Sequence, residues 1–225
     1  MKKFLLYALL AIIIIGLGTF LFIKPANHSP QDAGDESVPM PWDVKTFDDG
    51  SAEIFGVHLG FTTLQEVIDA WGMPDSIGLF AEQDEPQSIE VFFTTAPIGP
   101  MKAKVVLTLS LTDQELERMF ANASGQSGTA SGASRYILKD EDQRALLEHR
   151  IGNLTYIPAY KGLEAEYFET RLGKPQATHQ ETETAVSWFY PARGLTLLID
   201  DKGPEVFQYQ NPGDFNMPAE ARPYE

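Results

Sequence analysis

Histidines are the side chains in this sequence best suited to proton transfer or metal binding near neutral pH. There are four, His28, His58, His149 and His179. No two of them have the i, i+4 or short-loop spacing with which paired histidines hold a metal ion. We therefore interpret each as a surface or loop histidine and predict no metal site.

The sequence also lacks the patterns that mark a catalytic serine or cysteine. A hydrolase serine sits in a G-x-S-x-G turn, which the sequence lacks, and Ser127 lies in a Gly- and Ser-rich run that offers no rigid frame for a nucleophile. Cysteine is absent, which removes thiolate nucleophiles and disulfides and suits an oxidising compartment. The glycines of this run lack the lysine of a phosphate-binding loop, so we expect no cofactor.

Two acidic clusters have structural interpretations. The acids in "KDEDQ", Lys139 to Gln143, fall in the first turn of an expected helix, where the helix dipole favours them. The segment "DDKG", Asp200 to Gly203, is typical of a hairpin turn. With no catalytic residues to assign, we predict that the chain is not an enzyme.

The net charge restricts the choice of partner. The chain carries 17 Lys and Arg against 32 Asp and Glu, a formal charge of -15. Such a surface repels phosphate backbones and anionic lipid headgroups, so we expect no nucleic acid partner and no membrane contact beyond the N-terminal helix described next.

The N-terminal residues predict export. Phe4 to Ile23 is an uninterrupted apolar and small-residue run, preceded by Lys2 and Lys3, and as a helix it extends about 30 Å, the thickness of a bilayer core. We predict a single-pass anchor over residues 1–25 in the inner (cytoplasmic) membrane, with the N-terminus in the cytoplasm and the main domain in the periplasm. The alternative is a cleaved signal peptide with Gly16-Leu17-Gly18 as its cleavage site, which leaves a secreted protein.

Composition divides the rest of the chain. Residues 26–48 contain a Pro-rich acidic stretch and predict a flexible tether, residues 123–134 predict a Gly/Ser-rich linker, and residues 216–225 predict a loose tail. Two segments remain, 49–122 and 135–215, each large enough for a small folded unit.

The same helix ending occurs in both segments. "LQEVIDAWGMPD", Leu64 to Asp75, and "AEYFETRLGKPQ", Ala165 to Gln176, each place an amphipathic run before Gly-x-Pro. The glycine closes the last turn and the proline two residues later prevents continuation. A capping box can begin the first helix at Thr62 or Thr63, and a further helix is expected after Thr112.

Paired strands follow each helix. "IEVFF", Ile89 to Phe93, corresponds to "VSWFY", Val186 to Tyr190, and a second apolar strand comes after each. Alternation puts one set of residues on the core side: Ile89, Val91, Phe93, Val105, Leu107, Leu109, Val186, Trp188, Tyr190, Leu195, Leu197 and Ile199. We predict an α+β fold in which two tandem helix-plus-antiparallel-meander units pack into one or two small domains after an N-terminal transmembrane helix.

The segments "GFTTLQEVIDAWGMPD" and "GLEAEYFETRLGKPQ", with the strands after them, resemble the repeat of the BamE (SmpA/OmlA) family of small envelope lipoproteins. Two such units in tandem also resemble the β-lactamase inhibitor proteins. The resemblance covers roughly residues 56–110 and 158–210, and the chain lacks the lipid-acceptor cysteine of the first group and the disulfide cysteines of the second. It implies a periplasmic protein-binding role and transfers no contact residue.

The expected function is therefore binding. Alternation places Phe92 and Phe189 at matching positions on the sheet face opposite the helices, where exposed aromatic rings make a protein-binding hot spot. The alternative is that a loop or the other repeat covers both rings. We predict a membrane-anchored extracytoplasmic protein-interaction module with a role in envelope assembly or maintenance and an envelope protein as partner. An inhibitor or sensor of a periplasmic enzyme and a small-ligand-binding protein are the alternatives.

Overall fold

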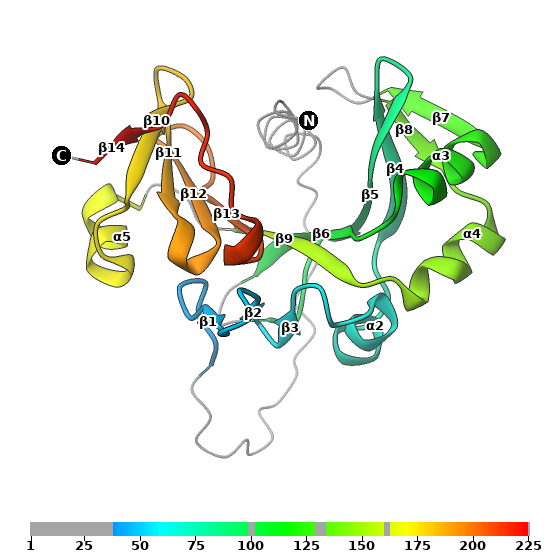
Figure 1. Ribbon diagram of the computed structural model, residues 1–225, viewed down its shortest axis with the longest axis horizontal. Helices are drawn as coiled ribbons and strands as arrows, with labels where there is room; N and C mark the ends of the chain where they lie inside the picture. The colour runs from blue at the N-terminus through cyan, green and yellow to red at the C-terminus, as the bar shows by residue number, and fades with distance from the viewer. Residues whose placement is uncertain (1–37, 99–101, 129–133, 160–162, 225) are drawn as a thin grey trace.

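A single large antiparallel sheet dominates the computed structural model, which describes residues 38–98, 102–128, 134–159 and 163–224. It has 11 strands in the order β14-β10-β11-β12-β13-β9-β6-β5-β4-β8-β7 (Figure 1). The strands are β4 (Ser76–Glu82), β5 (Glu85–Phe93), β6 (Ala103–Leu109), β7 (Gly125–Gly128), β8 (Ser134–Ile137), β9 (Ile151–Pro158), β10 (Ala177–Gln180), β11 (Ala185–Tyr190), β12 (Leu195–Asp200), β13 (Val206–Tyr209) and β14 (Arg222–Pro223).

Smaller elements complete the described fold. A three-stranded sheet is formed by β1 (Lys45–Thr46), β2 (Ala52–Ile54) and β3 (Val57–His58). The α-helices are α2 (Leu64–Trp71), α3 (Asp113–Asn122), α4 (Asp140–Ala145) and α5 (Ala165–Leu172), and the 3-10 turns are η1 (Leu146–Glu148), η2 (Pro191–Arg193) and η3 (Pro212–Asp214).

The helices begin and end where local chemistry dictates. Thr63 accepts the N–H of Glu66 while the Glu66 carboxylate accepts the N–H of Thr63, and Thr112 and Glu115 form the same reciprocal capping box on α3. Gly72 and Gly173 end α2 and α5 with φ angles of 90° and 78°, which side chains other than glycine rarely adopt. The predicted capping boxes and Gly-x-Pro stops are therefore confirmed.

All described helices lie on one face of the large sheet. Buried residues of α2, α3 and α5, among them Leu64, Met119 and Phe168, belong to one apolar cluster together with Ile89 and Leu197 of the sheet. Except for Val186, which is partly buried against it, every residue predicted for the core side belongs to this cluster. The alternation of these strands is thus confirmed as the signal that orients the sheet.

The predicted fold class is wrong. The structure is mostly antiparallel β, and the strands after both Gly-x-Pro stops belong to one 11-stranded sheet instead of two α+β units. The join is β9, which pairs with β6 on one side and with β13 on the other. Its register is Val105↔Tyr156↔Phe207, so a single strand closes the gap between the two meanders and makes their core continuous.

Three of the predicted segments lie outside the centre of the sheet. The anchor at residues 1–25 lies outside the described residues, and no described helix is long and apolar enough to cross a bilayer. The linker predicted at 123–134 contains β7 and the start of β8, because Gly125–Gly128 pair with Ser134–Ile137 at the sheet edge. Within the predicted tail, Arg222–Pro223 pair with β10 and Tyr224 packs on Trp188.

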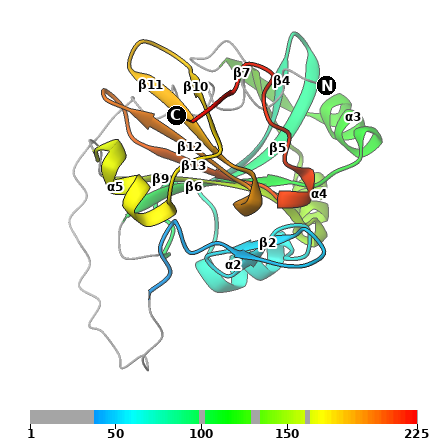
Figure 2. The same cartoon turned by 60° about the vertical axis from the view of Figure 1, so that its left-hand side comes forward.

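The large sheet is strongly bent. Its two halves rise on either side of the central strands β6 and β9, and α2, α5 and the small sheet lie on the outer side (Figure 1). A view turned by 60° also places α2 and β2 beneath β6 and β9 (Figure 2). The bend leaves a concave face, defined here as the sheet face opposite the helices, which includes Phe92, Glu90, Thr155 and Phe189.

Candidate functional site

The structure brings together a serine, a histidine and an aspartate that the sequence analysis had not connected. The Ser51 hydroxyl lies 2.6 Å from Asp49 Oδ1 and 2.7 Å from His58 Nε2. The Ser51 side chain is buried, and its N–H also donates to Asp49 Oδ1 at 2.9 Å. The trio forms because the turn after Phe47 and the hairpin of β2 and β3 place residues seven positions apart side by side.

The order of these three contacts excludes a serine-protease type of triad. In such a triad the aspartate holds the histidine, and the histidine accepts the serine proton. Here the carboxylate of Asp49 accepts from Ser51, and these two hydrogen bonds hold the pKa of Asp49 below its ordinary value. His58 Nε2 must then donate to the Ser51 oxygen, so the imidazole cannot take the serine proton.

His58 is also the centre of an aromatic stack. Its ring lies between Phe47, with centroids 4.5 Å apart, and Phe61, with centroids 4.2 Å apart. Lys45 Nζ covers the outer face of Phe47 and the Arg150 guanidinium lies over Phe61, at 5.1 and 6.0 Å from the ring centroids. Such cation–π contacts stabilise a folded surface, so we interpret the stack and its hydrogen-bonded trio as a structural clasp on β1–β3.

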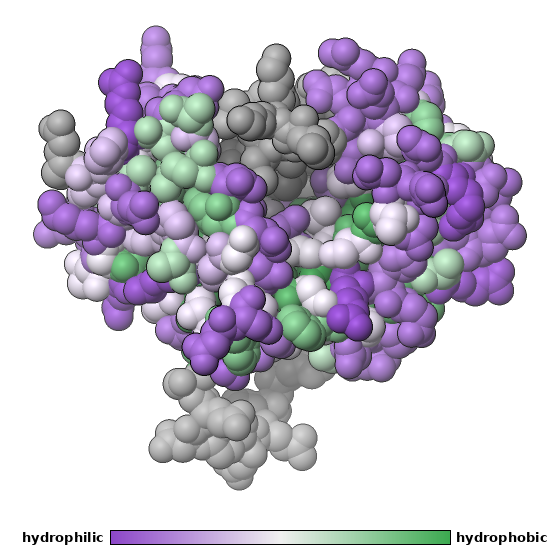
Figure 3. Space-filling model, viewed as in Figure 1, coloured by the Kyte–Doolittle hydropathy of each residue, from purple (hydrophilic) through white to green (hydrophobic). Residues whose placement is uncertain are grey.

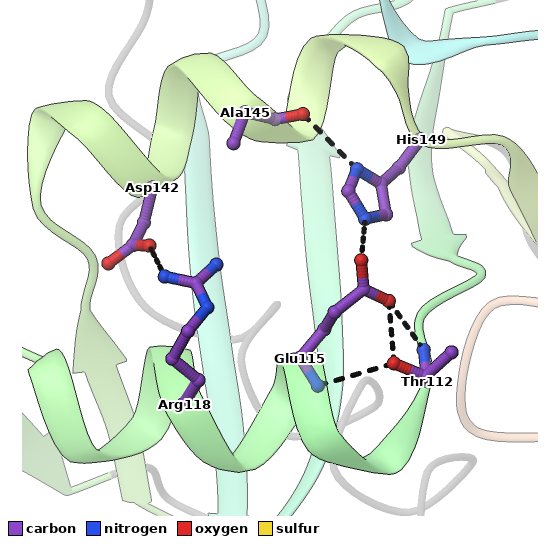
Figure 4. Close-up of polar contacts among 6 residues, drawn as sticks. All are labelled: Thr112, Glu115, Arg118, Asp142, Ala145 and His149. Atoms are coloured by element: carbon purple, nitrogen blue, oxygen red, sulfur yellow. Dashed lines mark hydrogen bonds and ion pairs between the residues drawn. The ribbon is translucent and has the colours of Figure 1, made fainter.

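The other histidines have structural contacts where they are described. His149 Nδ1 lies 3.2 Å from the Ala145 carbonyl oxygen and its Nε2 lies 3.4 Å from Glu115 Oε1, so that it bridges α3 and the end of α4 (Figure 4). His179 Nε2 lies 3.9 Å from Glu181, and His28 falls outside the described residues. Among the described residues, no group of three or more His, Asp or Glu is arranged to hold a metal ion.

A second link joins the same helices. Arg118 of α3 donates to Asp142 Oδ1 of α4 at 2.7 Å, and the Asp142 side chain is only 2% exposed (Figure 4). Its second oxygen, Oδ2, is buried without a hydrogen-bond partner. The pair orients α3 against α4 on the outer side of the sheet, away from the concave face.

Phe92 and Phe189 prove to lie on one continuous row across the concave face. Successive strand pairs connect them in the order Phe92, Val106, Thr155, Gln208, Thr196 and Phe189. Five strand steps correspond to about 24 Å along a flat sheet. The two aromatic positions therefore mark opposite halves of the bent sheet.

The two rings differ in exposure. Phe189 is only 2% exposed, so its ring is packed, whereas Phe92 is partly exposed. Between them, Gln208 Oε1 is buried without a hydrogen-bond partner. The buried apolar cluster on this face consists of strand residues alone, namely Ile157, Ala185, Leu198 and Val206. Phe92 is therefore the predicted contact residue that solvent reaches.

Glu90 is a titratable group on this face that the sequence analysis had not singled out. It lies two residues from Phe92 on β5, and its Oε1 accepts from the Ser88 hydroxyl at 3.3 Å. Burial raises the pKa of Glu90 to about 7. The sequence did contain a signal for this group. In "SIEVFF", period-two alternation puts Glu90 between Ser88 and Phe92 on the side of the strand that faces away from the helices.

Two surface hollows lie on the outer side. One of 240 Å³ is lined by Phe55, Val67 and Trp71 among others, and a wider one of 420 Å³ lies against α5. The first lies between α2 and the β2–β3 hairpin and the second against α5, so neither is the apolar pocket between repeats that a small-ligand binder requires. No family model, curated protein or solved structure matches this chain.

Proposed function

We propose that this protein is an extracytoplasmic protein-interaction module that binds its partner with the concave face, around Phe92. The observation that carries the proposal is the distribution of the described helices. All of them pack on one side of an 11-stranded sheet, while the opposite side carries the row from Phe92 to Phe189, in which Phe92 and Gln208 are partly exposed.

The composition of this face fits a protein partner better than a small molecule. Protein interfaces combine a few aromatic anchors with uncharged polar groups, and charged residues are depleted at their centres. Phe92 supplies a partly exposed ring, and Gln208 in the middle of the row is a partly exposed uncharged group, whereas Thr155 and Thr196 beside it are buried. The unsatisfied oxygen of Gln208 gains from a partner that donates a hydrogen bond.

The compartment is part of the same proposal. The export signal expected in residues 1–25 and the absence of cysteine both favour a partner in the cell envelope. The hydrophilic outer flanks of both halves fit a domain that keeps its outer side in solvent (Figure 3). If the partner is an enzyme of that compartment, the module acts as its inhibitor or sensor.

Site-specific photo-crosslinking in cells tests the proposal. The full-length chain carries p-benzoylphenylalanine at position 92 or, as a matched control, at position 73, where Met73 is 78% exposed on the outer side. We expect one protein to crosslink from position 92 and not from position 73. Equal crosslinking from both positions, or crosslinking from position 73 alone, overturns the assignment of the concave face.

A second variant separates binding from folding. With the crosslinker moved to position 108, on the strand next to Phe92 and on the same face, Phe92→Ala is expected to reduce the crosslinked product severalfold. The thermal unfolding midpoint of the variant is measured in parallel. If Phe92→Ala lowers that midpoint strongly and leaves the crosslink unchanged, the ring serves packing and the proposed contact is wrong.

A further inference from the structure

The sheet edge formed by β10 is only half covered. β14 pairs antiparallel with Ala177 and Thr178, which are two of the four residues of β10 (Figure 1). Just before β14 the chain turns, and the N–H of Ala221 donates to the Pro218 carbonyl oxygen at 3.1 Å. Among the described residues, no strand pairs with the outer edge of His179–Gln180. This part of the edge is therefore open to a longer strand.

The backbone of β14 is held by few contacts. The strand is two residues long, and both of its side chains are exposed. One of the two is Pro223, which has no N–H to donate to a neighbouring strand. The next residue, Tyr224, donates its N–H to the Gln176 carbonyl oxygen at 3.4 Å. A short edge strand with a proline prevents unspecific pairing with other chains, so β14 guards the β10 edge.

A group of side chains beside this edge holds Tyr224. The Tyr224 ring lies edge-on to Trp188, with 5.5 Å between the centroids, and Lys174 Nζ lies 5.2 Å from the Tyr224 centroid. The Tyr224 hydroxyl donates to Glu169 Oε1, and this hydrogen bond raises the pKa of the Tyr224 hydroxyl. An apolar wall, a cation and a carboxylate thus converge on one phenol ring. We call Trp188, Lys174 and Glu169 the tyrosine socket.

Contacts other than β14 fix the tyrosine socket. Trp188 belongs to β11 and is only 4% exposed, and Glu169 belongs to α5. Lys174 follows Gly173, whose carbonyl oxygen accepts from the Tyr190 hydroxyl at 3.0 Å. The second Gly-x-Pro loop therefore holds its lysine beside the sheet edge. Such preorganised groups favour binding, because little side-chain freedom is lost when a ligand enters.

We infer that the β10 edge and the tyrosine socket form a further binding site, which accepts an extended, tyrosine-bearing strand of a protein partner and which residues 222–224 fill until that strand displaces them. The chain's own segment shows the ligand chemistry, namely a strand antiparallel to β10 with a tyrosine opposite Gln176. A partner strand that also runs along His179–Gln180 pairs with all four residues of β10 and gains backbone hydrogen bonds that β14 lacks. The tyrosine socket includes a residue of α5, so this site is separate from the concave face and does not depend on it.

A synthetic strand tests the inference on the full-length chain. The probe is the fluorescein-labelled peptide Thr-Val-Thr-Val-Tyr-amide, whose tyrosine is opposite Gln176 when the other residues pair with β10. Fluorescence anisotropy measures its binding. In Tyr224→Ala the tyrosine socket is open, and we expect the probe to bind this variant about tenfold more tightly than the wild type, in which residues 222–224 occupy the site for most of the time.

Matched variants assign the binding to the tyrosine socket. In the Tyr224→Ala background, Glu169→Gln is expected to weaken binding about tenfold, because a hydrogen bond to a charged acceptor is lost. A probe with phenylalanine in place of its tyrosine should lose affinity to a similar extent. Glu166→Gln, which removes an exposed carboxylate from the same helix, is expected to leave binding unchanged. Tyr224→Phe keeps the ring on Trp188, and its affinity for the probe should lie between those of the wild type and Tyr224→Ala.

Several results overturn the inference. One is an absence of probe binding to Tyr224→Ala and Tyr224→Phe when both unfold at the same temperature as the wild type. Another is equal binding to the wild type and both variants, or binding that Glu169→Gln leaves unchanged, since the probe then binds elsewhere. Sedimentation of the wild type covers the remaining occupant. A dimer that dissociates in Tyr224→Ala shows that residues 222–224 bind a second copy of this chain, and the site for a partner strand is then wrong.

Discussion

The raised pKa of Glu90 predicts an unusual pH dependence of stability. In the unfolded chain this carboxyl group ionises with its ordinary pKa of 4.5, whereas in the folded protein burial raises the pKa to about 7. Between these two pH values the folded protein holds a proton that the unfolded chain has released. The contribution of Glu90 is therefore fully present below pH 4.5 and is lost as the pH rises through 7.

The size of the effect follows from the difference in pKa. A change of about 2.5 in pKa corresponds to roughly 3 kcal/mol of unfolding free energy. Because the Glu90 side chain keeps some contact with solvent, we expect about 2 kcal/mol. Glu90→Gln removes this pH-dependent contribution. The unfolding free energy of the variant minus that of the wild type is therefore expected to rise by about 2 kcal/mol as the pH increases from about 5 to about 8.

Urea unfolding at several pH values measures this difference. The fluorescence of Trp42, Trp71 and Trp188 reports the transition, and the unfolding free energy of each protein is obtained by linear extrapolation. Carboxylates with lowered pKa values, such as Glu66 and Glu115, are present in both proteins and cancel in the comparison.

Glu66→Gln provides the control for this series. The hydrogen bonds from Thr63 keep the pKa of Glu66 low, so its contribution is lost only as the pH falls toward and below 4.5. Its stability relative to the wild type should change little over the range in which Glu90→Gln shows its increase. A difference between Glu90→Gln and the wild type that stays constant across the same range would refute the reasoning.

Four further substitutions test the packing, a helix cap and two glycine positions. Phe168→Ala removes a fully buried ring from the main core and is expected to lower the unfolding free energy by about 3–5 kcal/mol in urea titrations. Thr112→Ala deletes the N-cap of α3 and should lower it by about 1 kcal/mol in the same assay. Gly194→Ala places a Cβ 1.8 Å from the Gln210 carbonyl oxygen at a φ of 61° and should cost roughly 3 kcal/mol or more, whereas Gly173→Ala, with no atom within 4 Å, should cost about 1–2 kcal/mol in thermal unfolding.

Local sequence patterns predicted the helix starts and the strands with alternating burial. The capping boxes at Thr63 and Thr112 form because the partner glutamate lies three residues away, within one turn. The strand Glu85–Phe93 shows alternating burial over Ile89 to Phe93, so its core face was predictable from period two alone.

The strand that decides the architecture lacks such a signal. In β9, the residues from Leu154 to Pro158 are all buried, so the alternation that marks a half-exposed strand is missing. β4 was also missed, and its pairing with both β5 and β8 depends on contacts far apart in sequence. Without these strands, the two meanders looked like separate α+β units.

The candidate site shows the same division. The sequence by itself determined the chemical inventory: no cysteine, a strong excess of acids, a helix cap at each capping box, and phenylalanines at matching strand positions. Only the tertiary structure decided that β9 joins both halves, that Phe92 and Phe189 share a row, and that Phe189 is packed while Phe92 reaches solvent. Helix caps and alternation act within a few residues, whereas strand partners, burial and the pKa of Glu90 depend on which distant segments meet across the sheet.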